Sequence, residues 1–185
     1  MIYIKNRLLF VHIPRTGGNS ITRTLTRATV CDQSLISVTD ATPRPNFLHR
    51  HSTYSEIVKF IPEVEDEHVI KFAVDRDPRQ IYESFYRLHR MSSRNVGDAQ
   101  WQESVRLSRS ETLNEFIDRL WVPWLDGRTI WEHWTSNDSR FHLVPYLQLQ
   151  QHWPTICEWA GLDVTIDLPC YDWQLLQLTK EASNV

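Results

Sequence analysis

One segment near the start of the chain restricts the fold more than any other, because it reads as a strand, a tight loop and the start of a helix. Residues 8–13 are apolar, Pro14 ends the run, and the polar sequence RTGGNS follows. Residues 19–29 show a helical pattern, with Ile21 and Leu25 on one face. Backbone N–H groups point outward at such a turn, and the helix dipole favours an anion there. The segment predicts a phosphate or sulfate cradle made of Arg15, Thr16, Gly17, Gly18, Asn19 and Ser20.

This loop differs from the Walker A loop of nucleoside triphosphatases. That motif needs a lysine directly after its last glycine, whereas Asn19 follows Gly18 here. An ordinary strand-to-helix turn would also explain the two glycines, which give the backbone conformational freedom. The charge of Arg15 and the hydroxyl groups of Thr16 and Ser20 favour an anion site over that alternative.

The same order of elements recurs about sixty residues later. Residues 68–74 (HVIKFAV) predict a second buried strand. Asp77 and Pro78 predict the start of a helix, since aspartate is a frequent N-cap and proline a frequent first helical residue. Ligands bind at the carboxyl edge of the strands in an α/β sheet. Both loops are therefore expected at that edge.

Arg76 and Ser84 are candidates for a second anion site. Arg76 ends the second strand, and Ser84 follows eight residues later, about two helical turns into the helix. A guanidinium can bond two oxygens of one phosphate, and a serine could hold the same group from another side. The spacing alone favours a simpler alternative, in which Arg76 pairs with Asp75 or Asp77 and Ser84 is ordinary helix surface.

Composition limits the function classes. A chain of 185 residues is most simply one domain, residues 1–185, and its net charge of −3 gives no general basic field for nucleic acid. Residues 1–100 hold 14 Lys and Arg against 11 Asp and Glu, whereas residues 101–185 hold 6 against 12 and all eight tryptophans. We expect the anion-binding residues in the first half and aromatic packing, with a platform for a ligand, in the second half.

The cysteines and the apolar runs bear on the cellular compartment. Cys31, Cys157 and Cys170 are too dispersed for a zinc motif and too few for a disulfide framework, which favours buried or free thiols. The later histidines, His68, His89, His133, His142 and His152, show no clustering that suggests a metal. The first residues lack the apolar core of a signal peptide, and no apolar run approaches the ~20 residues of a membrane span. These features predict a cytoplasmic protein without a membrane partner.

Other elements follow from local patterns. Residues 1–4 predict a strand in a hairpin with residues 8–13, and residues 164–166 predict a late strand. Expected helices are residues 54–60, with Thr53 and Glu56 as a capping box; residues 112–121, ended by Pro123; and residues 147–159, ended by Gly161. Residues 31–46 predict a loop, residues 92–110 a mobile loop or lid with at most a helical piece inside, and residues from 179 a frayed tail.

The two loop segments, FVHIPRTGGNSI and KFAVDRDPRQIYESFY, resemble the cofactor loops of the sulfotransferase superfamily. They are most similar to the group that contains heparan sulfate 2-O-sulfotransferase and its microbial relatives. The resemblance implies an α/β fold, namely a P-loop-like three-layer α/β/α arrangement with a central, mainly parallel sheet and a helical, Trp-rich C-terminal half. It also implies 3′-phosphoadenosine 5′-phosphosulfate (PAPS) as co-substrate, with no metal. The first loop would bind the 5′-phosphosulfate, and Arg76 and Ser84 the 3′-phosphate. Residues 1–90 would then form the cofactor-binding core, and residues 91–185 the mostly helical packing and the acceptor side.

The resemblance further places a catalytic histidine just before the helix at residues 54–60. His49-Arg50-His51 keeps the His-x-His spacing of heparan sulfate 2-O-sulfotransferase. Residues i and i+2 of an extended segment point the same way, so both histidines could face the acceptor. A histidine suits a base because its pKa lies near working pH. We favour His51 over His49, leave open that neither abstracts a proton, and expect His12 to be structural.

Arg15 departs from the family pattern, which usually has a lysine that contacts the bridging oxygen of the departing phosphate. Arginine can stabilise that charge but is a very poor proton donor. The leading hypothesis is sulfuryl transfer from PAPS to a hydroxyl of a carbohydrate or a small molecule, with His51, His49 and Arg15 as catalytic residues. The alternatives are a PAPS-binding protein with impaired chemistry and, less favoured, an atypical ATP-dependent phosphotransferase. The oligomeric state and the acceptor are left open.

Overall fold

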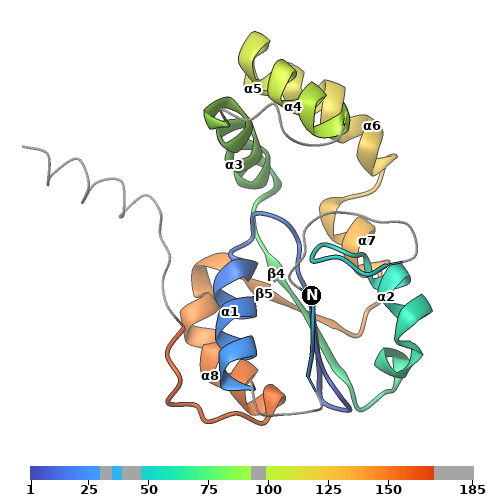
Figure 1. Ribbon diagram of the computed structural model, residues 1–185, viewed down its shortest axis with the longest axis vertical. Helices are drawn as coiled ribbons and strands as arrows, with labels where there is room; N and C mark the ends of the chain where they lie inside the picture. The colour runs from blue at the N-terminus through green and yellow to red at the C-terminus, as the bar shows by residue number, and fades with distance from the viewer. Residues whose placement is uncertain (30–34, 39–46, 93–98, 169–185) are drawn as a thin grey trace, which may run out of the picture.

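The computed structural model describes residues 1–29, 35–38, 47–92 and 99–168. In chain order its elements are β1 (Ile2–Ile4), β2 (Leu8–Val11), α1 (Gly18–Ala28), β3 (Leu35–Ser37), α2 (Tyr54–Phe60), η1 (Pro62–Glu65), β4 (Ile70–Asp75), α3 (Pro78–Met91), α4 (Ala99–Ser110), α5 (Leu113–Phe116), η2 (Ile117–Trp121), α6 (Val122–Leu125), α7 (Ile130–Thr135), β5 (Phe141–Pro145), η3 (Tyr146–Gln148) and α8 (Leu149–Ala160). The fold is α/β, as the sequence predicts (Figure 1).

Within the described residues the sheet has five strands in the order β3-β1-β2-β4-β5. β1 pairs antiparallel with β2 and with β3, which confirms the predicted hairpin and adds an edge strand. β2, β4 and β5 pair in parallel. The carboxyl ends of these three parallel strands therefore meet at one edge of the sheet, where the two predicted loops begin.

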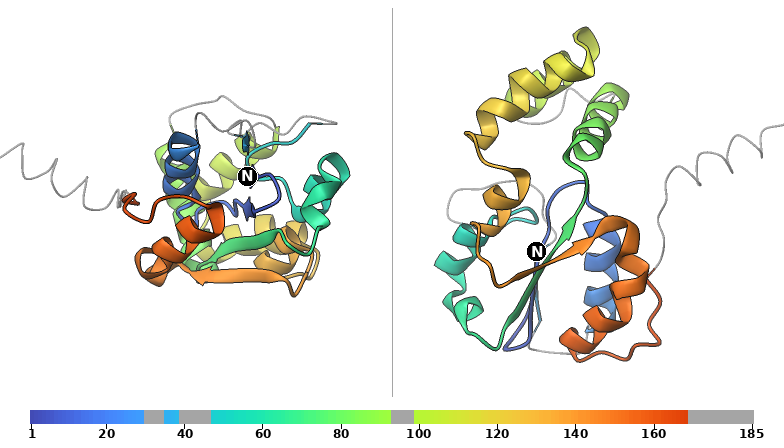
Figure 2. Two further views of the ribbon diagram at one scale, coloured as in Figure 1. Left: turned by 90° about the horizontal axis from the view of Figure 1, so that it is seen from below. Right: turned by 180° about the vertical axis from the view of Figure 1, so that it is seen from behind.

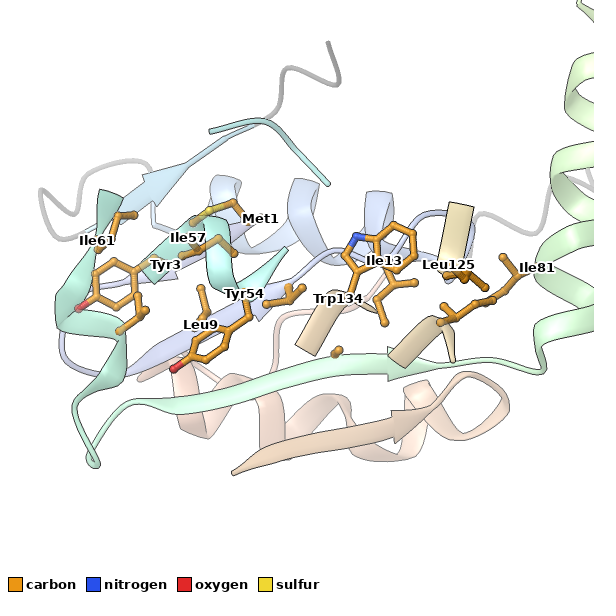
Figure 3. Close-up of a cluster of buried hydrophobic side chains, with 14 of the residues drawn as sticks. Met1, Tyr3, Leu9, Ile13, Tyr54, Ile57, Ile61, Ile81, Leu125 and Trp134 are labelled. Atoms are coloured by element: carbon orange, nitrogen blue, oxygen red, sulfur yellow. The ribbon is translucent and has the colours of Figure 1, made fainter. Parts of the chain in front are cut away.

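Alternating side chains of the strands divide the core between the two faces of the sheet. Even-numbered residues of β1 and β2, such as Ile4 and Phe10, pack with α1 and α8, whereas odd-numbered residues, such as Tyr3 and Leu9, pack with α2 and α7. This is the two-residue period of a strand with both faces buried. Figures 1 and 2 show these helices on opposite faces, and Figure 3 shows the side that α2 and α7 cover.

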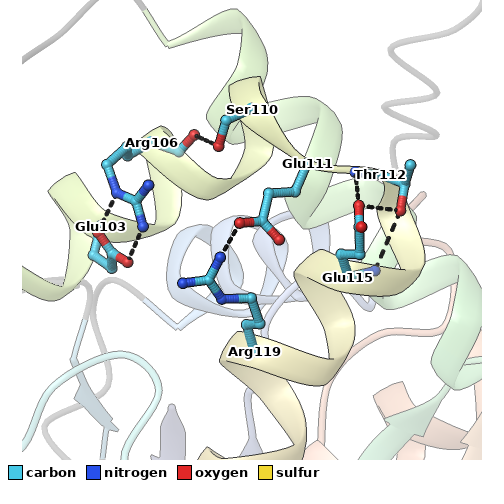
Figure 4. Close-up of polar contacts among 7 residues, drawn as sticks. All are labelled: Glu103, Arg106, Ser110, Glu111, Thr112, Glu115 and Arg119. Atoms are coloured by element: carbon cyan, nitrogen blue, oxygen red, sulfur yellow. Dashed lines mark hydrogen bonds and ion pairs between the residues drawn. The ribbon is translucent and has the colours of Figure 1, made fainter.

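Helices α3 to α6 form a lobe beyond the carboxyl edge of the sheet (Figures 1 and 2). Within residues 92–110, where the sequence predicts a loop or lid with a helical piece inside, Ala99–Ser110 form the 12-residue helix α4; residues 93–98 lie outside the described part. Few large apolar residues mark this helix, but Ser104 and Ser108, four residues apart, are buried beside Val105 and Leu107. Arg106 and Glu103 form an ion pair within α4, while the Arg119–Glu111 ion pair and a capping box at Thr112 and Glu115 lie at the turn that follows it (Figure 4).

Pro123 does not end the helix before it, contrary to the prediction. The helical path runs from Leu113 to Leu125 because η2 is a π-helical turn, in which the Val122 N–H donates to the Ile117 carbonyl five residues back. Proline lacks an N–H and normally clashes with the preceding helical turn. The widened turn lets Pro123 lie at the start of α6, in the first-turn position where proline is tolerated.

Two further expectations are corrected. Residues 164–166 form a turn rather than a strand, because the Asp163 side chain accepts from the Thr165 N–H and its carbonyl from the Ile166 N–H. Residues 35–37, expected in a loop, form the partly exposed edge strand β3. Cys157 is buried and is a free thiol, while Cys31, Cys170 and the tail from residue 179 lie outside the described residues. Among those that are described, no helix is long and apolar enough to cross a membrane.

Candidate functional site

A cleft of about 1960 Å³ lies between the carboxyl edge of the parallel strands and the helical lobe. Its walls include the loop after β2, the residue after β4, and residues of α3, α4, α6 and α7. The 49–51 segment also lines it, so the cleft brings together the three parts of the chain in which the sequence placed candidate residues.

The backbone of the first loop is shaped for close approach to a ligand. Gly17 lies in the left-handed region with φ of 83° and forms the N-cap of α1, so the N-cap residue offers no side chain to the first N–H groups of the helix. A methyl group on Gly18 would come within 2.2 Å of the His12 ring, so only glycine fits without movement. Arg15 also has a positive φ, 64°, which is uncommon for a residue with a side chain. Without a side-chain cap or an acidic residue in its first turn, α1 presents its positive dipole end to the cleft.

Arg15, Arg76 and Ser84 come together although they lie on separate loops and a helix. The Arg15 Nε donates to the Ser84 hydroxyl oxygen at 2.9 Å, and an Arg76 terminal nitrogen donates to the Arg15 carbonyl at 2.7 Å. Burial and the charge of Arg76 lower the pKa of the Arg15 guanidinium. Neither Asp75 nor Asp77 forms an ion pair with Arg76 within the described residues. The two guanidinium groups thus form a positive corner in the cleft, which an anion would stabilise.

Tyr146 is a site residue that the sequence interpretation missed. Its ring lies under the Arg76 guanidinium, 4.5 Å from the ring centre, and a methyl group on Gly17 would come within 3.0 Å of it. A cation–π contact of this kind holds an arginine in place. The signal was present in the sequence: Tyr146 directly follows the apolar run of residues 141–145, which is the third parallel strand, β5.

The remaining residues of the cradle take different positions. Thr16 is fully buried, and its hydroxyl donates to the Ile13 carbonyl at 2.8 Å, which closes the loop from inside. Asn19 is exposed and its side-chain oxygen accepts from Arg50 at 3.2 Å. Gly17, Gly18, Asn19 and Ser20 line the cleft with Arg15. A direct contact with an anion is therefore most accessible to the backbone of the first helical turn and to Arg15.

His51 has the geometry of a base. Its Nδ1 lies 2.9 Å from the His12 carbonyl oxygen, and a carbonyl oxygen can only accept, so Nδ1 carries the ring proton. The lone pair of neutral His51 is then on Nε2. The pKa of His51 is lowered to about 4, mainly by burial. The hydrogen bond to His12 acts in the opposite direction, and the charge of Arg50 lowers the pKa further. His51 is consequently neutral and able to accept a proton at neutral pH.

His49 has the opposite arrangement. Its Nδ1 accepts a hydrogen bond from the His51 backbone N–H at 3.2 Å, so a neutral His49 carries its proton on Nε2. It can donate a hydrogen bond through Nε2 but has no ring lone pair left to accept a proton. Both histidines line the cleft, and the hydrogen bonds assign them different roles.

Two residues fix the segment that carries these histidines, and neither was singled out from the sequence. Arg50 links it to the first loop through Asn19, and its place between the two histidines was the available signal. Trp134 on α7 donates from its indole nitrogen to the His51 carbonyl at 3.0 Å. No local pattern could indicate this contact, because 83 residues separate the two partners.

Aromatic rings form the wall of the cleft beside His51. Trp124 packs against Trp121, His133 and Trp134 with ring centres 4.5–5.2 Å apart, and its side chain is 37% exposed. Trp121, Trp124, His133 and Trp134 all line the cleft. A ring that is held on several sides and open on another offers a flat, rigid surface to a ligand.

The chain matches no known protein family, and comparisons with curated proteins and with solved structures give no significant match. The function is therefore inferred from the residues of the cleft and their geometry.

Proposed function

We propose that the protein is a PAPS-dependent sulfotransferase that transfers a sulfuryl group to a hydroxyl of a carbohydrate or a small molecule. The observation that carries the proposal is the contact between Arg15, Arg76 and Ser84 in a cleft that also contains His51. Two arginines, an uncapped helix start and a neutral histidine are the groups that transfer of a charged group to a hydroxyl requires.

The residues present fit an anionic co-substrate with two charged ends. The start of α1 and Arg15 would hold the 5′-phosphosulfate, because the dipole and the guanidinium both favour negative charge. Arg76 and Ser84 would hold the 3′-phosphate; the Ser84 hydroxyl accepts from Arg15, so its own hydrogen remains to be donated. The aromatic wall at Trp124 would receive the acceptor on the side of His51.

The chemistry assigned to these residues is one proton transfer and one exchange of bonds at sulfur. His51 accepts the acceptor's hydroxyl proton on Nε2 while the acceptor oxygen forms a bond to sulfur. The bond between sulfur and the bridging phosphate oxygen breaks, and its electron pair stays on 3′-phosphoadenosine 5′-phosphate (PAP). Arg15 and the start of α1 stabilise the charge that develops on that phosphate. Positioning and charge provide most of the catalysis in a loose transition state of this type.

A PAP-binding protein with impaired transfer is the second candidate, and Arg15 is the observation that favours it. An arginine in the usual place of lysine can stabilise charge but holds its proton too firmly to act as an acid. In addition, the Nε of Arg15 already donates a hydrogen bond to the Ser84 hydroxyl oxygen. On this account Arg15→Lys would increase turnover, whereas on the first account it would change turnover little.

The test is transfer of radiolabelled sulfate from PAPS to a panel of carbohydrate and small-molecule acceptors. His51→Gln should lower the transfer rate by about 10²–10⁴-fold, the usual contribution of a general base, and leave PAP affinity within about twofold. His142→Gln, an exposed change on β5 away from the cleft, is the matched control and should transfer normally. Binding of PAP without transfer to any acceptor would favour the second candidate, and equal transfer by His51→Gln would exclude His51 as the base.

A further inference from the structure

His12 lies at a junction between the base and the anion cradle, although the sequence suggested only a structural role. It follows β2 and is 2% exposed. Its ring stacks on Phe10 at 5.6 Å and meets the His51 ring edge-on at 4.6 Å. The Cδ2–Nε2 edge lies against the backbone of Gly18, since a methyl group there would be 2.2 Å from Cδ2 and 2.4 Å from Nε2. Nε2 thus borders the first turn of α1.

The other ring nitrogen of His12 shows where the proton resides. Nδ1 is buried and has no hydrogen-bond partner among the described residues. A buried N–H without an acceptor is rarer in native proteins than an unsatisfied acceptor. The proton of a neutral His12 is therefore expected on Nε2, at the edge that faces the start of α1. Burial, His51 and Arg50 lower the pKa of His12 well below its usual range, which keeps the ring neutral.

We propose that His12 is a ligand-binding residue whose Nε2–H donates a hydrogen bond to the anionic group held at the start of α1. Three observations carry it: the ring lines the cleft, Nε2 borders Gly18, and the buried ring lacks a partner on its other nitrogen. The identity of the anion, a sulfuryl or phosphate group of PAPS, rests on the proposed function. The contact itself does not, because any tetrahedral oxyanion at this helix start would meet the same N–H.

In this role His12 would position both the base and the group that is transferred. The His12 carbonyl fixes the tautomer of His51 at 2.9 Å, and the His12 ring would fix the group that His51 helps to transfer. A displacement of His12 would then move base and anion together. That prediction separates a ligand-binding His12 from one that only fills the space between Phe10 and Gly18.

Long-range ¹H–¹⁵N NMR of the imidazoles in the full chain tests the proposal without a mutation. His12 should show a protonated Nε2 and an unprotonated Nδ1 in the free protein. Titration with inorganic sulfate, and separately with PAP, should move the Nε2 and Hε2 resonances of His12 and leave those of His142 in place. A proton on Nδ1, or His12 resonances that stay fixed while PAP binds, would overturn the proposal.

Two variants measure the size of the contact by calorimetric titration with PAP. His12→Phe removes the donor and should weaken binding by about tenfold or more, as expected for a hydrogen bond to a charged group. His12→Gln places an amide N–H near the position of Nε2 and should recover part of the affinity. His142→Phe is the control and should bind as the unaltered chain does.

The outcomes separate this proposal from the proposed function. If sulfate shifts the Nε2 and Hε2 resonances of His12 while PAP fails to bind, the contact is supported and the sulfotransferase assignment is contradicted. If PAP binds the unaltered chain and His12→Phe equally well, the sulfotransferase assignment is supported and the His12 contact is contradicted. Failure of both probes to bind the unaltered chain would overturn both.

Discussion

The packing of Gly18 on His12 makes a prediction that a double-mutant cycle can test. A methyl carbon at Gly18 would lie 2.2 and 2.4 Å from two atoms of the His12 ring, well inside the contact distance of roughly 3.5–4 Å. Overpacking of this kind costs about 1–3 kcal/mol, and Ala in place of Gly in a helix returns about 0.5–1 kcal/mol. Gly18→Ala should therefore lower the free energy of unfolding by about 1–2 kcal/mol.

The sign should reverse when the ring is removed. In the background of His12→Ala the added methyl group meets no ring, so Gly18→Ala should raise the free energy of unfolding by up to about 1 kcal/mol. Urea denaturation of the four proteins gives the coupling, expected at about 2 kcal/mol. Gly161→Ala is the control, because Gly161 has φ of 67° and contacts Arg7 rather than His12. Its cost should be equal in both backgrounds. An equal effect of Gly18→Ala in both backgrounds would refute the inferred contact.

Three further predictions concern the elements that hold the site. Trp134→Phe removes the indole donor to the His51 carbonyl and should cost about 1 kcal/mol in urea denaturation; an unchanged midpoint would mean that the bond is absent in solution. Thr129→Ala removes the capping box that Glu132 completes at α7 and should also cost about 1 kcal/mol, whereas a cost near zero would contradict the cap. The pKa values of His51 and His89 are about 4 when folded against 6.5 unfolded, so the unfolded state binds more protons between these values and stability should fall as pH decreases from about 6.5 to 4. Replacing His89 with Phe should weaken that dependence, and a stability that is flat over this pH range would contradict the neutral folded histidines.

The strand-loop-helix segments were predictable because their signals are local. Continuous apolar runs identified β2 and β4, and Asp77 with Pro78 marked the start of α3, where the Asp77 side chain accepts from the Gln80 N–H. The capping box at Thr53 and Glu56 likewise fixed the start of α2. The strands β2 and β4 are parallel neighbours. The loops that follow them therefore lie at the same edge of the sheet, as the order of the elements predicted.

Other features depend on contacts that no local pattern records. α4 packs on α3, where the His89 and Trp101 rings lie 4.4 Å apart, and it buries two small serines rather than a stripe of large apolar residues. The π-turn before Pro123 compensates for a residue that ordinarily ends a helix. The sequence favoured His51 over His49 as the base but could not show which ring nitrogen of each carries the proton. That depends on the backbone partners of the two Nδ1 atoms, the His51 N–H for His49 and the His12 carbonyl for His51. These partners depend on how the segment docks on β2.

The most direct test of the proposed function is the preference of the cleft for a 3′-phosphate. Calorimetric titration should show that PAP binds at least tenfold more tightly than adenosine 5′-phosphate, because only PAP carries the group assigned to Arg76 and Ser84. Arg76→Ala should reduce that preference by about ten- to hundredfold, the value of a charge-assisted hydrogen bond. Arg79→Ala removes an exposed arginine of α3 that does not line the cleft and should keep the preference. Equal affinity for the two nucleotides, or tighter binding of Mg-ATP than of PAP, would contradict the account.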